Sequence, residues 1–363
     1  MRPEVWDAMR PFVTDAFGNS TGPHAPARAA KNALEEARER VAATIGARPN
    51  EIVFTGGGTE SNNLAVKGSV LFRGARGGVV ASAIEHDAVL ESVESVGELG
   101  CPTALVDANE DGVVEPDVIV TSVSPDTALV SVMAANNETG VVQPIQELVL
   151  ALRDEGFSAL VHTDAIQAFA SERIDVRQLG VDLLSLAAHK LGGPKGMGIL
   201  FVREGVGLEP GLHGGGQELG RRSGTANVMG AVGTAVAMER ASADRTRYRK
   251  RTAAERDEFE AILADQKPEI LVTGVGVKRL PGHSHLTIPD VDSQILLMKL
   301  DRSDLAVSTG SSCKSGAASA SHVLLSMGMD VGQARSALRF SFGWTSQPGD
   351  GAKAARGLIL ALR

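Results

Sequence analysis

The chain has 363 residues, of which 43% are hydrophobic and 22% are charged, which is typical of a folded protein with one large domain and a smaller one. Its 36 Lys and Arg residues are outnumbered by 44 Asp and Glu residues, giving a formal net charge of −8 that argues against direct binding of nucleic acid. Two cysteines, Cys101 and Cys313, are too few for a disulfide framework or an all-cysteine metal site, and we expect no metal ion.

Apolar runs alternate with amphipathic stretches through the first two thirds of the chain. Ala30, Leu34, Ala37 and Val41 recur at helical spacing, which predicts a helix, and the apolar residues 52–54 predict a short buried strand after it. Further strands are predicted at residues 79–80, 129–133, 159–161, 182–186 and 198–202, and helices at residues 88–99 and 145–155. This alternation is typical of an α/β fold with a mainly parallel sheet flanked by helices.

A long helix is predicted from Asn227 onward. Val228, Ala231 and Ala235 share one face of this helix and are apolar, as expected for a face that packs against a core. The second half of the helix, residues 239–260, is densely charged, which is typical of a solvated helix face.

We place the boundary between two domains along this helix. Residues 1–245 form the large domain, and residues 246–363 form a smaller α+β domain. In the smaller domain, strands are predicted near residues 285–288 and 305–308. A segment of small polar residues follows the second of these, and we expect it to be mobile.

A glycine cluster, residues 56–58, lies with Thr59 between a predicted strand and a predicted helix. Glycines allow a ligand to approach the backbone closely, and the first turn of a helix offers free N–H groups and a positive dipole end. Phosphate is therefore the natural ligand. A tight turn without a ligand is the alternative, because the spacing is neither that of a Walker loop nor that of a dinucleotide fingerprint.

Two polar residues follow neighbouring predicted strands. Asp164 lies at the carboxyl end of one strand, where open α/β sheets bind ligands, although an aspartate there is also a common helix N-cap. Lys190 follows another strand and precedes the glycines 192–193. A lysine at this position is well suited to meet an aldehyde once it is desolvated and loses its proton. A surface lysine before a turn is the alternative.

Two further loops carry basic or reactive side chains. Residues 213–225 combine glycines, two arginines and Thr225, which suits either an anion-binding segment or an exposed loop. Residues 308–321 are small and polar, and they include Cys313 beside a lysine. A thiol in such a segment is costly unless its reactivity is used, so we interpret Cys313 as a nucleophile and Cys101 as structural.

Taken together, these segments resemble the cysteine desulfurases, which belong to the class V aminotransferase group of pyridoxal-phosphate (PLP) enzymes of fold type I. Eight motifs occur in family order between about Phe17 and Gly343, and this order is far more specific than any single motif. The matching segments are residues 57–65, 85–89, 136–140, 162–167, 189–190, 214–225, the loop around Cys313 and residues 339–343.

The resemblance implies how a PLP ring is held in the large domain. Lys190 would carry PLP as a Schiff base, and Asp164 would pair with the pyridinium nitrogen, which makes the ring an electron sink. His86 would stack on the ring and is a candidate acid and base. Gln167 would bond the ring hydroxyl.

The resemblance also implies how the PLP phosphate is bound. The Gly58 backbone, Thr59 and His189 would contact it, and Thr225 would reach the phosphate of a partner subunit, so a homodimer is expected. The phosphate-binding serine of the family is replaced by Ala187 in this chain. We therefore expect the chain to retain PLP less tightly than a chain with serine at this position.

The implied reaction converts L-cysteine to L-alanine. Asn137 and Arg339 would hold the substrate carboxylate, Arg339 by a bidentate contact. Lys190 would remove the Cα proton, and the Cys313 thiolate would attack the substrate sulfur and keep it as a persulfide. The long loop around Cys313 resembles the group of desulfurases that serves iron–sulfur cluster assembly and related sulfur delivery.

Two sets of alternatives remain at this stage. The reaction could be that of a selenocysteine lyase or another class V PLP enzyme. This chain also starts with a helix-like stretch, residues 2–9, at a point beyond the first active-site segment of the family, which keeps a non-catalytic scaffold for sulfur assembly as a further alternative.

The expected partners and location follow from the same reading. The sulfur acceptor would be a protein such as an iron–sulfur scaffold, or a component of tRNA thiolation or DNA phosphorothioation, without direct contact of this chain with nucleic acid. No apolar run is long enough to span a bilayer, and the first seven residues lack the apolar core of a signal peptide. We therefore expect a cytoplasmic protein that does not bind a membrane.

Overall fold

The structure is a computed structural model that describes residues 1–309 and 320–363. These residues divide into two compact units. The first comprises Met1–Val106, Pro116–Ala134 and Pro144–Asp244, and the second comprises Asp107–Glu115, Ala135–Gln143 and Arg245–Arg363. The chain passes from the first unit to the second for the last time within the long helix α8, Val228–Gln266.

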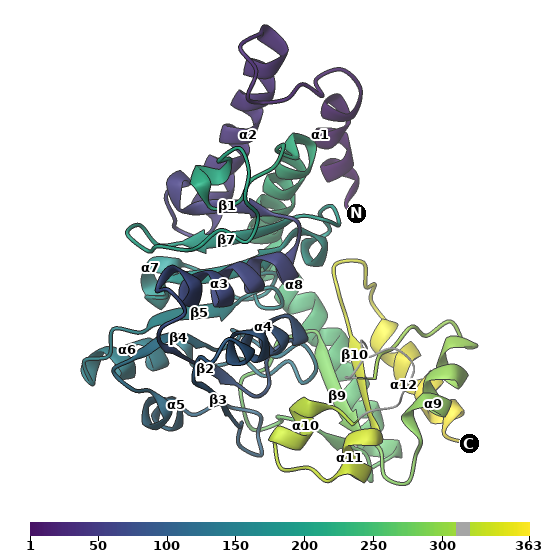
Figure 1. Ribbon diagram of the computed structural model, residues 1–363. Helices are drawn as coiled ribbons and strands as arrows, with labels where there is room; N and C mark the ends of the chain where they lie inside the picture. The colour runs from purple at the N-terminus through teal and green to yellow at the C-terminus, as the bar shows by residue number, and fades with distance from the viewer. Residues whose placement is uncertain (310–319) are drawn as a thin grey trace. The chain divides into compact units, whose positions relative to one another are not determined.

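The centre of the first unit, within the described residues, is a seven-stranded sheet (Figure 1) with the strand order β1-β7-β6-β5-β4-β2-β3. Strands β2 to β6 run parallel to one another, and β7 runs antiparallel to both β6 and β1. The mainly parallel α/β sheet predicted from the sequence is thus confirmed. The strands are β1 Ile52–Thr55, β2 Gly78–Ser82, β3 Thr103–Val106, β4 Thr127–Ser131, β5 Leu160–Asp164, β6 Leu183–Ala187 and β7 Gly198–Val202.

Most strands in the middle of this sheet are buried along their whole length, which explains why their sequences are mainly apolar. Every residue of β2, β4, β6 and β7 is buried, as expected for strands covered on both faces by helices. Edge strand β3, which we did not predict, is largely exposed, although its sequence TALV is the same as that of the first four residues of buried β4.

The helices of the first unit pack against this sheet. Helix α3 lies across β4 to β7 and beside α4, while α6 lies next to both α5 and α7. The core between α3 and the sheet includes Val53, Leu64, Leu129 and Leu200. The helices are α1 Pro3–Thr14, α2 Ala25–Thr44, α3 Gly58–Phe72, α4 Asp87–Glu98, α5 Pro116–Ser122, α6 Ile145–Asp154 and α7 Val176–Leu179, with 3-10 turns η1 Pro49–Glu51, η2 Ala188–Leu191 and η3 Glu218–Gly220.

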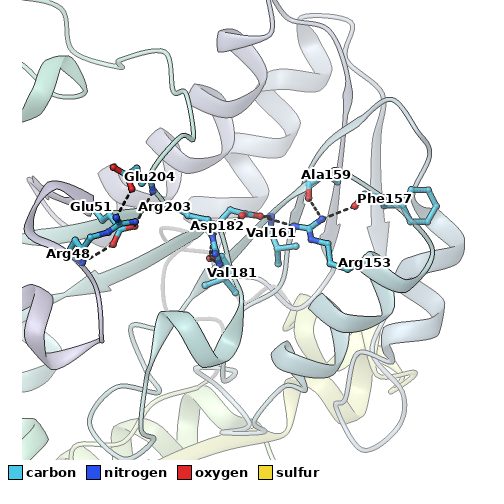
Figure 2. A network of polar contacts seen from close by, with 10 residues as sticks. All are labelled: Arg48, Glu51, Arg153, Phe157, Ala159, Val161, Val181, Asp182, Arg203 and Glu204. Atoms are coloured by element: carbon cyan, nitrogen blue, oxygen red, sulfur yellow. Dashed lines mark hydrogen bonds and ion pairs between the residues drawn. The ribbon is translucent and has the colours of Figure 1, made fainter.

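A network of ion pairs joins several strand ends of the first unit (Figure 2). Asp182, just before β6, pairs with Arg153 at 3.0 Å and with Arg203 at 3.1 Å, and it also accepts a hydrogen bond from Val161 N in β5 at 2.9 Å. One buried carboxylate thereby ties together β5, β6 and the end of β7.

The second unit contains, among the described residues, a three-stranded antiparallel sheet with the order β10-β9-β8. Its core includes a cluster of aromatic rings in which the centroid of Phe259 lies 4.6 Å from that of Phe340 and 6.0 Å from that of Phe342. The elements are β8 Leu271–Val272, β9 His283–Thr287, β10 Ala337–Ser341, α9 Ser293–Asp301, α10 His322–Ser326, α11 Val331–Arg335 and α12 Asp350–Ala361.

The prediction of a strand near residues 305–308 is wrong. Only Ser308 pairs there, in an isolated bridge with Arg339 of β10. The apolar side chains of Leu305 and Val307 pack against the core of the second unit, so their alternation reflects burial without a strand. Elsewhere, none of the described helices is long and apolar enough to cross a membrane.

Candidate active site

Asp164 ends strand β5 and is held rigidly by two hydrogen bonds. Asn62 of α3 donates from Nδ2 to Oδ2 at 2.7 Å, and the backbone N–H of Ile166 donates to Oδ1 at 2.9 Å. Only 5% of the residue is exposed. Burial raises the pKa of Asp164, while these hydrogen bonds and the positive charges of His86 and Lys190 act to lower it. The structure therefore brings Asp164, His86 and Lys190 into one electrostatic neighbourhood.

Lys190 and His189 lie in the 3-10 turn η2, directly after β6. The turn ends at Gly192, which has a φ of 80°, a left-handed conformation that glycine adopts without a steric penalty. Both side chains are exposed in the single chain. The pKa of His189 is lowered by partial burial and by the charges of Lys190 and Lys195, which favours a neutral imidazole.

The glycine turn between β1 and α3 is closely packed. A Cβ atom at Gly58 would come 2.3 Å from the Ile166 side chain, and the same atom would lie 3.5 Å from the Cβ of Ala187. Gly57 precedes the helix with a φ of 151°. The first N–H groups of α3 have no intrahelical partners by geometry, so this turn offers donors beside the ends of β5 and β6.

His86 is the N-cap of α4, where its Nδ1 accepts a hydrogen bond from Ala88 N at 3.0 Å. This bond assigns the ring proton of a neutral His86 to Nε2. The ring is exposed, and Gln167 is half-buried in the loop after β5. Thr225 is exposed in residues 213–225.

Glu85 is a buried carboxyl group to which we assigned no role from the sequence. Its Oε1 accepts hydrogen bonds from Ser82 Oγ at 2.5 Å and from Met133 N at 2.6 Å, and the residue is 0% exposed. Burial, together with the charge of Asp164, raises the pKa of Glu85 to about 8. Asn62 was missed in the same way, although both residues lie within the quoted motifs.

The two residues expected to bind the substrate carboxylate lie together in the second unit. Arg339 on β10 donates from Nη1 to the carbonyl oxygen of Asn137 at 2.5 Å. Burial lowers the pKa of Arg339, and the charge of Glu138 opposes this shift. Its Nε is buried without a hydrogen-bond partner among the described atoms, so the guanidinium retains donor capacity for a carboxylate. Cys313 lies outside the described residues.

The residues of the first unit fit a PLP molecule. An anionic acceptor at the end of β5, a lysine at the end of β6 and a glycine turn at the start of α3 match the ring nitrogen, the aldehyde and the phosphate of this cofactor. A cavity of about 780 Å³ adjoins the turn and is lined by Gly57, Thr59 and Arg222, among others, but its lining does not include Asp164 or Lys190. Within the described part of the chain, no group of His, Cys, Asp and Glu side chains is arranged to hold a metal ion.

The chain is similar to known proteins over most of its length. Residues 1–350 match the model of the family described as aminotransferase class-V. The chain is 38% identical to the cysteine desulfurase IscS of Dictyoglomus turgidum over 94% of this chain and 87% of that protein. It is 41% identical to the cysteine desulfurase IscS of Anaeromyxobacter sp. (strain K) over 94% of this chain and 84% of that protein.

Solved structures show the same fold. A NifS-like protein superimposes with a TM-score of 0.92 at 32% sequence identity, covering 100% of this chain and 97% of the other. SspA in complex with cysteine superimposes with a TM-score of 0.83 at 33% identity, covering 94% and 96% of the two chains.

Proposed function

This chain belongs to the class-V aminotransferase family and is a cysteine desulfurase, and from that premise we propose that Lys190 holds PLP while Cys313 accepts sulfur from L-cysteine. The observation that carries the proposal is the fixed carboxylate of Asp164, which lies in the electrostatic neighbourhood of Lys190 and His86. When bound, PLP supplies an electron sink whose strength depends on a protonated ring nitrogen. Asp164 is placed to keep that proton.

The remaining contacts with PLP are proposed from their positions in the first unit. The N–H groups at Gly58 and the hydroxyl of Thr59 bind the phosphate at the positive end of α3, together with His189. Gln167 bonds the ring hydroxyl and His86 stacks on the ring. Thr225 completes the phosphate site of a second copy of the chain, so we propose a homodimer.

Substrate binding is proposed for the second unit. Arg339 donates one N–H group to the carbonyl oxygen of Asn137. We propose that other N–H groups of its planar guanidinium donate to the carboxylate of L-cysteine. Lys190 takes the proton from the substrate Cα. The Cys313 thiolate attacks the substrate sulfur and retains it as a persulfide, and alanine is released.

The source and the acceptor of the sulfur are proposed as a substrate and a class of partner protein. Since SspA has a structure with bound cysteine and the IscS relatives are named as cysteine desulfurases, L-cysteine is the proposed substrate and a sulfur-accepting protein is the proposed partner. We place this reaction in the cytoplasm, where a reduced thiol persists.

The test is alanine formation from L-cysteine by PLP-loaded protein. We expect activity in the wild type and none in Lys190→Ala or Cys313→Ser. The matched controls are Lys195→Ala, which removes a nearby exposed lysine, and Cys101→Ser, which changes a buried thiol that contacts Ala75 O at 3.4 Å. Alanine formation by Cys313→Ser at the wild-type rate would contradict the proposed role of that thiol.

A further inference from the structure

A buried carboxylate, that of Glu218, connects the loop of residues 213–225 to helix α2 and strand β1. Glu218 accepts two hydrogen bonds from Arg38 of α2, from Nη1 at 2.7 Å and from Nη2 at 2.9 Å. Its Oε2 also accepts the backbone N–H of Phe54 in β1 at 2.9 Å. The Arg38 and Glu218 side chains are only 8% and 6% exposed, so this is a buried, bidentate ion pair.

Arg38 is itself fixed on several sides. Its Nη1 also donates to Ile52 O of β1 at 2.8 Å, and its guanidinium carbon lies 5.0 Å from the centre of the Phe54 ring. Burial acts to lower the pKa of Arg38, but the hydrogen bonds and the charge of Glu218 raise it on balance. Helix α2, strand β1 and the loop therefore meet at this pair.

The loop needs such an attachment because its backbone is strained at the same place. Glu218 has a φ of 50° and Leu219 a φ of 58°, and neither is a glycine. Side chains with a Cβ rarely adopt this left-handed region, and consecutive residues there persist only where the surroundings enforce them. Leu219 is also 66% exposed, so its own packing does not account for the conformation.

A second carboxylate continues the connection to the glycine turn. Glu60 accepts a hydrogen bond from Gly56 N at 2.8 Å and pairs with Arg222 of the loop at 2.8 Å. Phe54, which Glu218 holds, lies two residues before Gly56. The loop is therefore bonded to Phe54, which precedes the glycine turn, and to Glu60, which follows it.

We propose that Glu218 is a positioning residue that locks residues 213–225 to strand β1 and thereby shapes the site for the PLP phosphate. This inference rests on the proposed binding of PLP. Glu218 does not touch the phosphate. It holds the strand that leads into the glycine turn and the loop that ends at Thr225, so its loss weakens phosphate binding without changing the groups that meet the ring.

The experiment compares the affinity of the apoprotein for PLP with its affinity for pyridoxal, which lacks the phosphate, by absorbance titration. For Glu218→Gln we expect the Kd for PLP to rise about tenfold, as for the loss of about 1.4 kcal/mol, and the Kd for pyridoxal to stay within twofold. The matched control is Glu35→Gln. Glu35 also pairs with Arg38, at 3.1 Å, but it is 49% exposed, and its removal leaves both dissociation constants unchanged.

The double variant Glu218→Gln/Leu219→Gly tests the role of the strain. A glycine adopts the left-handed conformation without penalty, so we expect it to restore part of the lost PLP affinity. Glu218→Asp keeps Arg38 paired while shortening the reach to Phe54 N, and it provides the same PLP-against-pyridoxal comparison if Glu218→Gln does not fold.

Equal losses of PLP and pyridoxal affinity, or a PLP affinity within twofold of wild type in a folded Glu218 variant, would overturn the positioning role. If the proposed function is wrong, the wild-type protein itself will not bind PLP in this titration. That result differs from a failure of the positioning role, in which the wild type binds PLP and the Glu218 variants behave as described.

Discussion

Two carboxyl groups, Glu85 and Asp164, are buried close enough for their charges to interact. Like charges in a low-dielectric setting resist simultaneous ionisation, so one group keeps its proton. Glu85 accepts hydrogen bonds from Ser82 and Met133 but is fully buried, and its pKa is raised to about 8. Asp164 has its hydrogen bonds from Asn62 and Ile166 and two nearby positive charges. At neutral pH, Glu85 therefore keeps its proton, and Asp164 is the carboxyl group that we propose to pair with the ring nitrogen of PLP.

This assignment predicts how stability depends on pH. Between about pH 4.5 and about pH 8, the unfolded chain releases the Glu85 proton while the folded chain keeps it, so the free energy of unfolding falls as pH rises through this window. Urea unfolding between pH 5 and pH 8 should show a smaller fall for Glu85→Gln than for the wild type. Glu94→Gln, on the exposed face of α4, serves as the control, and parallel curves for Glu85→Gln and the wild type would refute the prediction.

Ala187 offers a second test at a single residue. Its Cβ lies 3.5 Å from the position that a Cβ on Gly58 would occupy, so a hydroxyl at residue 187 would lie beside the glycine turn. A hydrogen bond to a charged group contributes about 1.5–3 kcal/mol, and we expect Ala187→Ser to slow PLP dissociation by roughly tenfold. The measurement is the rate of PLP loss after dilution into a PLP-binding trap, and equal rates for the two proteins would show that the missing serine is unimportant here.

At the scale of elements, the packing of the central sheet depends on a few long-range polar contacts at strand ends. Asp182 is the clearest case, because it joins β5, β6 and β7 through Val161, Arg153 and Arg203 (Figure 2). Its side chain is 11% exposed. Removing Asp182 leaves the buried N–H of Val161 without its acceptor, which costs more than the bond contributes in net stability. Arg153 and Arg203 keep their hydrogen bonds to backbone carbonyl oxygens.

We therefore expect Asp182→Ala to lower the free energy of unfolding by about 2 kcal/mol. The control is Glu204→Ala at the other end of the network, where the ion pair with Arg48 is about half exposed and its loss should cost less than about 1 kcal/mol. Denaturant unfolding of both variants measures these changes in the free energy of unfolding. Equal decreases for the two variants would mean that the contribution of Asp182 to stability does not depend on its burial.

At the scale of the whole molecule, the proposed contacts with PLP belong to the first unit and the proposed carboxylate contacts to the second. We propose that the first unit acts as the cofactor domain and the second as the smaller domain. Adding PLP to the apoprotein should then slow amide hydrogen exchange in β5 and β6 of the first unit, since ligand binding stabilises the state that binds it. Strand β9 should exchange at its original rate, and equal slowing in both units would contradict this division.

Much of the fold was predictable from sequence because its signals are local. Buried strands such as β6 and β7 are continuous apolar runs, and amphipathic helices such as α2 repeat at helical spacing, so type and approximate position follow from periodicity. The same local reading failed at residues 305–308, where alternating apolar residues pack on a core without pairing as a strand. Edge strand β3 was also missed, although its sequence TALV is the same as the start of buried β4, so the position of a strand in the sheet is not encoded in its own residues.

For this protein, the sequence by itself determined the α/β class, the family and the identity of most candidate site residues, since ordered motifs name them one by one. Only the tertiary structure decided which residues support them. Asn62 meets Asp164 across 102 residues of chain and Arg38 meets Glu218 across 180. No periodicity or motif spacing encodes such pairs, because they depend on how separate helices, strands and loops are brought together in space, and the burial that makes Glu85 hold its proton depends on the same packing.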